Sequence, residues 1–290
     1  MNPPAAPLDP KHEKALQALI AWWDEAGIEL DAPVVRPRSA PAASPSRSAG
    51  AEPARHQASR ATQSPAPAAT AAAARAAGFG QTVQEGPSSL ELAAKAQTLD
   101  ELKSAIEAFE GCALKRTARN TVFARGDRAA RVMVVGEAPG KEEDESGEPF
   151  VGPAGHLVDR MLASIGIERD TVYMSNILNW RPPGNRTPTQ DEIALCLPFI
   201  ERHVALKAPD ILILAGGLAA QALLRETTGI TRLRGRWQDY AIRGTDGEAS
   251  GKTIPALPIF HPSYLLRRPP EKKSAWIDML ALQSRLSLED

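Results

Sequence analysis

The chain has 290 residues, of which 43% are hydrophobic and 24% are charged, so it has enough apolar material for a core and is not disordered throughout. Its 34 basic and 35 acidic residues leave a formal net charge of −1, which neither points to a polyanionic partner nor excludes one. The two cysteines are too few for a disulfide framework and suit a reducing compartment. Because no apolar run approaches a membrane span and the N-terminus lacks the layout of a signal peptide, we expect a cytoplasmic protein.

The first segment, residues 1–31, predicts one short amphipathic helix. Its apolar residues recur at helical spacing, at Leu16, Leu19, Ile20 and Trp23. Two interpretations stay open. The helix docks on its own domain, or it binds a protein partner at the end of a tether.

Residues 32–86 are predicted to be a disordered linker rich in alanine, proline and serine. Within 32–78 these three types supply 31 of 47 residues. The stretch therefore has too few large apolar side chains to offset the entropy of ordering the chain. Six arginines stand against the single Glu52 in that stretch, a net charge of +5 that could hold loosely to a nucleic-acid backbone. We favour the simpler interpretation of a soluble spacer.

Residues 87–290 are predicted to be the folded domain, an α/β structure of three layers, α/β/α, around a central four-stranded parallel sheet. Short runs that are apolar on both faces alternate with amphipathic segments, which indicates parallel strands covered by helices on both sides. Two shorter helices precede the sheet, one opened by Ser89 and one by the capping box of Thr98 with Glu101. Strands are expected at 131–135, 172–178, 210–215 and 254–260, and helices at 154–165, 189–206, 218–227 and 271–286.

Chemically useful residues gather where the predicted strands end. In an open parallel sheet, ligands bind just beyond the carboxyl ends of the strands. Gly136 and Glu137 follow the first strand, with Phe150 in the segment after them, Asn176 lies in the second strand, and His261 follows the fourth. Each has an ordinary structural explanation when taken singly, such as a turn glycine or a core phenylalanine. Together at one edge of the sheet they favour an active site.

Three separated motifs resemble those of the family-4 uracil-DNA glycosylases. The first is GEAPG at 136–140 with Glu143-Asp144, PFVG at 149–152 and Ala154-Gly155. The second is SN at 175–176 with RPPGNR at 181–186, and the third is HPSYLLR at 261–267. The likeness covers roughly residues 109–286 in the family's order and spacing, and it leaves out the N-terminal helix and the linker.

The resemblance implies hydrolysis of the bond that joins uracil to deoxyribose in DNA, the first step of base-excision repair. Glu137 would orient or activate the attacking water and offset charge on the sugar cation. Phe150 would stack on the flipped base, beside Gly136, and Asn176 would bind its Watson–Crick edge. His261 would stabilise the departing uracil. These residue types suit the reaction, because a cationic sugar needs a nearby negative charge and a leaving anion needs a hydrogen-bond donor.

The segment after the histidine suits contact with DNA from which a base has been flipped. Small polar and basic residues can meet phosphate, and bulky ones can fill the vacated stack. Of Leu265 and Leu266 we expect one to be core and the other to contact DNA. The arginines of residues 230–237 are expected to add charge for the backbone. The residues assigned to DNA binding are Pro262, Ser263, Tyr264, Leu265 and Arg267.

Family-4 enzymes typically carry a [4Fe–4S] cluster held by four cysteines, and here the chain departs from the pattern. Cys112 and Cys196 match two of the ligand positions, whereas Phe109 and Trp180 stand at the other two. A cubane cluster requires four protein ligands, normally thiolates, and this chain has two cysteines. We therefore expect no metal and no other cofactor, with the two aromatic side chains filling the volume of the cluster.

An alternative to the enzyme is a binding module for uracil-containing or single-stranded DNA that cleaves weakly or not at all. The presence of both Glu137 and His261 favours catalysis, because a binding module has little need of the carboxylate. A relative that traps DNA covalently ranks last, since residues 230–240 contain no histidine to act as the extra nucleophile. The expected partner is uracil-containing DNA, not a membrane, and the expected oligomeric state is a monomer.

Overall fold

The structure is a computed structural model that describes residues 17, 20 and 86–287. The predicted N-terminal helix and linker lie outside the described residues, except for Gln17 and Ile20, which are helical, and Gly86 at the end of the linker. Within the described residues, no helix combines the length and the hydropathy that would let it cross a lipid bilayer.

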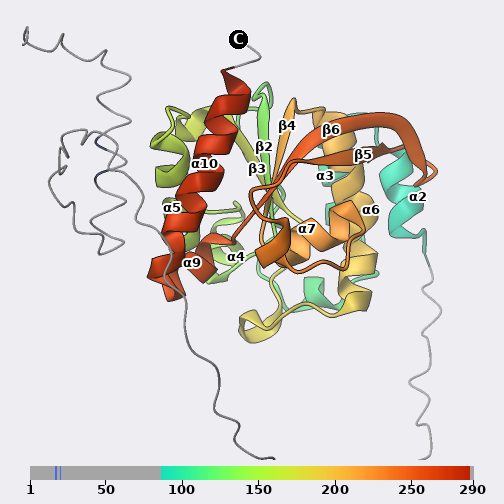
Figure 1. Ribbon diagram of the computed structural model, residues 1–290. Helices are drawn as coiled ribbons and strands as arrows, with labels where there is room; N and C mark the ends of the chain where they lie inside the picture. The colour runs from blue at the N-terminus through green and yellow to red at the C-terminus, as the bar shows by residue number, and fades with distance from the viewer. Residues whose placement is uncertain (1–16, 18–19, 21–85, 288–290) are drawn as a thin grey trace, which may run out of the picture. The chain divides into compact units, whose positions relative to one another are not determined.

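A six-stranded sheet of order β1-β3-β2-β4-β6-β5 runs through the domain (Figure 1). The inner four strands, β3, β2, β4 and β6, are parallel to one another, which confirms the predicted parallel core. The outer strands β1 and β5 pair antiparallel and were not predicted. The strands are β1 (Arg125–Gly126), β2 (Val132–Gly136), β3 (Val172–Asn176), β4 (Ile211–Ala215), β5 (Gln238–Arg243) and β6 (Ala249–Ile259).

The two edge strands escaped prediction because neither carries the apolar run of a central strand. β1 is only two residues long, and β5 is mostly half-buried along its length. β6 begins at Ala249, before the predicted start at residue 254. The prediction missed its first residues because they are exposed and pair only with β5. The sequence pattern thus detects the strands that are covered on both faces and misses those that are not.

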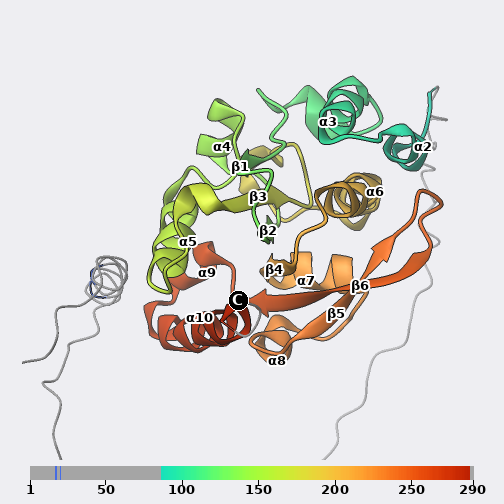
Figure 2. The same cartoon turned by 90° about the horizontal axis from the view of Figure 1, so that it is seen from above.

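Helices cover both faces of the sheet, as Figure 2 shows, and the three-layer prediction is confirmed. The four helices predicted within and after the sheet are present with ends that differ by at most three residues. One face carries α2 (Ser89–Lys95), α3 (Leu99–Ala108), α6 (Gln190–Lys207) and α7 (Gly217–Leu224). The other carries α5 (Pro153–Ala163), α9 (Pro262–Arg267) and α10 (Lys272–Leu286). The remaining helices are α4 (Lys141–Ser146) and α8 (Ile230–Leu233).

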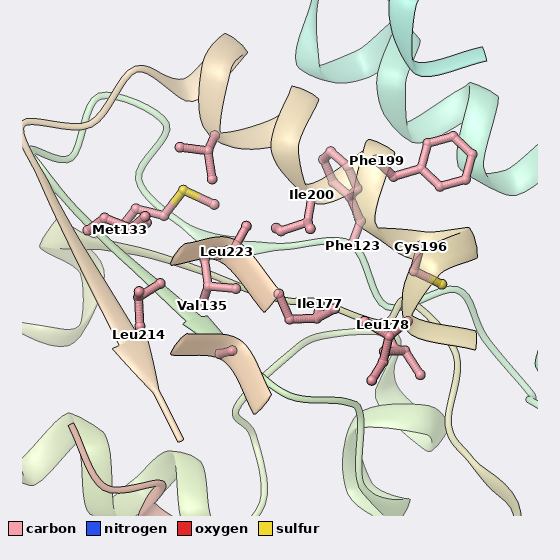
Figure 3. Close-up of a cluster of buried hydrophobic side chains, with 14 of the residues drawn as sticks. Phe123, Met133, Val135, Ile177, Leu178, Cys196, Phe199, Ile200, Leu214 and Leu223 are labelled. Carbon is pink, nitrogen blue, oxygen red and sulfur yellow. The ribbon is translucent and has the colours of Figure 1, made fainter. Parts of the chain in front are cut away.

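The central strands divide their side chains between two apolar cores. In β2, Met133 and Val135 enter the core under α6, while Val132 and Val134 enter the core under α5 and α10. Figure 3 shows the first core, in which Met133 and Val135 lie with side chains of α6 and α7. Each fully buried aliphatic side chain stabilises the fold by about 1.5–3 kcal/mol, so the strands are held chiefly by this two-sided burial.

The parallel register aligns the carboxyl ends of the strands. Gly136 at the end of β2 pairs with Asn176 at the end of β3, and Ala215 of β4 pairs with Ile259 of β6. Pairing continues past the strands, because the amide of Leu178 donates to the carbonyl oxygen of Glu137 at 3.1 Å. The loops that carry polar residues therefore leave the sheet at one common edge.

A histidine of α6 is buried against the sheet and hydrogen-bonded there. His203 is 1% exposed, its Nε2 lies 2.8 Å from the hydroxyl of Tyr173, and its ring stacks on Phe123 at a centroid distance of 4.3 Å. Burial, and then the charges of Lys207 and Arg128, lower the pKa of His203 from 6.5 to about 3. The imidazole is therefore neutral in the folded protein.

We expect His203 to make the domain sensitive to acid. Because its pKa is lower in the folded than in the unfolded chain, the unfolded chain binds the extra proton as the pH falls below about 6.5, and stability is then lost. Between about pH 7 and pH 5 this group alone should lower the free energy of unfolding by about 2 kcal/mol. Urea unfolding of wild type and of His203→Gln at both pH values measures the difference. The same pH dependence in the two proteins would contradict the assignment.

Candidate active site

A cavity of about 410 Å³ lies at the carboxyl edge of the parallel strands. Glu137, Phe150, Asn176 and His261, which come from the three separate motifs, all line it. Its volume is within the range of small-molecule sites. The structure therefore brings together the four side chains that the sequence singles out.

Gly136 lets two walls of the cavity meet. A Cβ atom at this position would lie 2.5 Å from Oδ1 of Asn176 and 2.6 Å from Cζ of Phe150, so only glycine leaves room for both side chains. Phe150 and Asn176 are each 4% exposed. The ring of Phe150 also stacks near that of His261, with centroids 6.4 Å apart and an interplanar angle of 27°. An aromatic face and an amide edge thus adjoin at the end of β2.

The conformation of Phe150 is unusual. Its φ is +57°, in the left-handed region that non-glycine residues seldom adopt. Such a backbone is unfavourable by roughly 1–3 kcal/mol and persists only where surrounding contacts hold it.

His261 is held as a neutral imidazole of one tautomer. It forms the N-cap of α9, where its Nδ1 accepts from the backbone amide of Ser263 at 3.2 Å and lies 2.7 Å from the Ser263 hydroxyl. Burial and then the charge of Arg267 lower the pKa of His261 to about 4. Because Nδ1 is an acceptor, the single proton of the neutral ring lies on Nε2, which is then a hydrogen-bond donor.

Glu137 lies in the same cavity, and its pKa is shifted in the opposite direction to that of His261. Burial raises the pKa of Glu137, and the positive charge of Arg267 lowers it in part. Arg267 lines the cavity as well, so one guanidinium favours both the ionised carboxylate and the neutral imidazole. The site can therefore offer a negative charge and an uncharged donor together.

The position of helix α9 requires a correction to the residues predicted to bind DNA. Leu265 is 0% exposed and packs in the core beside α5, which contradicts its assignment to DNA, and Pro262 is buried as well. Leu266 is 36% exposed, so of the two leucines it is the one that reaches the surface. Residues three apart share one face of a helix, and the face of α9 that holds Pro262 and Leu265 is its buried face. Ser263 lines the cavity with Arg267, and Tyr264 packs on Phe260.

One of the arginines expected to contact DNA is engaged within the protein. Arg234 pairs through Nε with the buried carboxylate of Asp278 at 3.0 Å, and its guanidinium lies over the ring of Phe260 at 5.3 Å. A residue committed to such a partner is not free to bind phosphate. Arg232 and Arg236 are exposed, and their role stays a prediction.

The cavity also contains residues to which the sequence analysis gave no individual role. Glu143 lines it from α4, and Asn185 and Arg186 line it from the segment between β3 and α6. Asn185 has φ of +53° and accepts from Nε of Arg181 at 2.6 Å. The available signal was the RPPGNR motif at 181–186, which carried the resemblance as a block.

The two cysteines lie together in the core under α6, away from the cavity lining. Cys112 and Cys196 are each 0% exposed, and contact between the thiols lowers the pKa of Cys112 to about 7. Phe109 and Trp180 belong to the same buried cluster, with ring centroids 6.4 Å apart. Among the described residues, no group of three or more His, Cys, Asp or Glu could hold a metal ion. This donor set does not fit a four-thiolate cluster.

Comparison with known proteins agrees with the resemblance that the three motifs indicate. The model of the uracil DNA glycosylase superfamily matches residues 123–281. The chain is 38% identical over 177 residues to the type-4 uracil-DNA glycosylase of Archaeoglobus fulgidus, an alignment that spans 60% of this chain and 85% of that one. It is 39% identical over 157 residues to the enzyme of the same name from Thermotoga maritima, spanning 54% and 77%. The chain therefore belongs to the uracil-DNA glycosylase superfamily, within its type-4, or family-4, group.

We expect Gly136→Ala to destabilise the domain. The added methyl group would meet the side chains of Asn176 and Phe150, and overpacking of this kind lowers stability by about 1–3 kcal/mol. Gly229→Ala is the matched control, because Gly229 has a φ of −69° and no atom within 4 Å of an added Cβ. Urea unfolding checks both variants. Equal stability of Gly136→Ala and wild type would contradict the close approach at this site.

Proposed function

We propose that this chain is a uracil-DNA glycosylase that hydrolyses the N-glycosidic bond of uracil in DNA and leaves an abasic site for base-excision repair. The observation that carries the proposal is that Glu137, Phe150, Asn176 and His261 line one cavity of about 410 Å³. The names of five relatives support it, since these are type-4 uracil-DNA glycosylases 32–39% identical to this chain.

The base is bound after it leaves the stack. Flipping requires a few kcal/mol, least for a mispaired base such as uracil opposite guanine. Phe150 then stacks on the ring of the base, while the amide of Asn176 accepts from N3–H and donates to O4. Cytosine presents the reversed pattern and would leave buried polar groups unpaired, so the site rejects it.

Bond breaking depends on two groups of opposite character. The electron pair of the bond between C1′ and N1 departs with the base, and Nε2–H of His261 donates to an oxygen of the uracil anion. The sugar gains positive charge, which the carboxylate of Glu137 offsets while it orients the water that adds to C1′ and accepts its proton. Support for these roles comes from the protonation states, because burial and Arg267 favour a neutral His261.

The DNA strand is proposed to lie against the exposed side of α9. Ser263 and Arg267 line the cavity and can meet the phosphates that flank the flipped nucleotide. Leu266 replaces Leu265 as the apolar side chain that enters the vacated stack. Tyr264 is also proposed to contact DNA, because it follows Ser263 directly along α9.

We also propose that the protein works without an iron–sulfur cluster. Phe109 and Trp180 stack on each other, Phe109 meets Phe199 edge-on at 5.3 Å, and Nε1 of Trp180 donates to the hydroxyl of Thr121 at 3.0 Å. These contacts supply packing where the family has metal and sulfide. Two free thiols support the cytoplasmic location proposed for the chain.

An abasic-site assay on a uracil-containing oligonucleotide, single- and double-stranded, tests the function. We expect wild type to release uracil, and Glu137→Ala and His261→Ala to lower the rate by about 10²–10³-fold each, the usual effect of removing one preorganised group. Matched controls are Glu148→Ala and His156→Ala, both exposed and outside the cavity, which should retain the rate. Wild type that binds the strand and releases no uracil would support the binding module instead.

Metal analysis tests the second proposal. Anaerobically purified protein should contain well under about one iron per chain, whereas about four irons with matching sulfide would overturn it.

If the aromatic rings stabilise the core in place of a cluster, Trp180→Ala should lower the free energy of unfolding by about 3–5 kcal/mol. A loss below about 1 kcal/mol would mean that the ring is not part of a packed core.

A further inference from the structure

The carboxylate of Glu143 joins two segments of the cavity wall. Its Oε2 accepts from the backbone amide of Gly140 at 2.9 Å, and its Oε1 accepts from the amides of Val151 and Gly152 at 3.1 and 2.9 Å. The residue is 8% exposed. A buried carboxylate that accepts three backbone hydrogen bonds holds those amides firmly, because such charge-assisted bonds are stronger than neutral ones.

The two segments carry different parts of the site. Gly140 ends the loop that begins at Glu137, and Val151 directly follows Phe150. A Cβ at Gly140 would lie 2.6 Å from Oε2 of Glu143, so the loop closes tightly on the carboxylate. Glu143 is thus the link between the segment that bears the acid and the segment that bears the stacking ring.

Phe150 is fixed from both neighbours. On its N-terminal side, the carbonyl oxygen of Pro149 accepts from Nε of Arg125 at 2.9 Å, and Arg125 is itself paired with Asp159 at 2.6 Å. On its C-terminal side, Glu143 holds the amide of Val151. These two anchors account for the left-handed backbone of Phe150, whose φ of +57° needs support from its surroundings.

We infer that Glu143 is a positioning residue, which sets the stacking ring of Phe150 and the loop of Glu137 at the spacing that a flipped pyrimidine requires. It acts through backbone amides, because both of its carboxylate oxygens accept from them. This inference rests on the proposed function for its kinetic consequence, but its structural consequence is independent of that function.

Glu143→Gln tests the inference with little change of shape. An amide has one accepting oxygen, so at least one of the two segments loses its acceptor and faces an N–H group instead. We expect the single-turnover rate of uracil release to fall about 10–100-fold, as misplacement by about 1 Å produces. Affinity for the abasic product strand should change less than about 3-fold, because α9 is untouched.

The matched control is Glu91→Gln. Glu91 makes the same kind of cap at α2, accepting from the amide of Ser88 at 2.8 Å, but it is exposed and joins no second segment. It should leave uracil release unchanged. If Glu143→Gln also leaves the rate unchanged while wild type is active, the inference is wrong and the proposed function stands.

A double-mutant cycle with Phe150→Ala separates positioning from general destabilisation. If Glu143 acts on the reaction through Phe150, the two losses of activation free energy, calculated from the rate ratios, should be clearly less than additive, whereas a merely structural role gives additive losses. Additive free-energy losses would overturn the assignment of Glu143 to the positioning of Phe150.

Amide hydrogen exchange provides the readout that does not need activity. In Glu143→Gln, either the amide of Gly140 or the amides of Val151 and Gly152 should exchange at least about 10-fold faster, while the amides of β2 keep their protection. Unchanged exchange at all three positions would overturn the inference. Wild type that releases no uracil would contradict the proposed function alone, and the exchange result would still decide the role of Glu143.

Discussion

The site depends on the register of two neighbouring strands. The pairing of Gly136 with Asn176 brings a position without a side chain opposite an amide, and the ring of Phe150 closes over both. A shift of one residue would turn Asn176 to the opposite face of the sheet and put another side chain in its place. Register in turn is held by the two cores, because every residue of β2 and β3 is buried.

Arg267 acts on both titratable groups at this edge. Burial acts in opposite directions on the two titratable groups, raising the pKa of Glu137 and lowering that of His261. Arg267 opposes the first shift and reinforces the second, so it favours the ionised form of Glu137 and the neutral form of His261 within one cavity. The proposed cleavage uses this pair, a negative charge beside the sugar and an uncharged donor beside the departing base. An environment that shifts two pKa values in opposite directions gives the two side chains different roles.

The packing around the two cysteines is separate from the chemistry. Neither thiol lines the cavity, nor do Phe109 and Trp180. The aromatic pair, with Phe199 on its flank, gives that region an ordinary apolar core. The side chains that line the cavity are therefore not those that pack around the two cysteines.

The parallel core, the three layers and four of the side chains that line the cavity could be predicted from the sequence alone. This was possible because strand periodicity is local and the topology of parallel sheets places all carboxyl ends at one edge. The edge strands β1 and β5, the burial of Leu265 and the pairing of Arg234 with Asp278 were decided by tertiary structure. So was the role of Glu143, whose partner amides at Val151 and Gly152 lie eight and nine residues away along the chain. Which face of a short helix is covered, and which polar groups find one another, depends on neighbours that only the folded chain supplies.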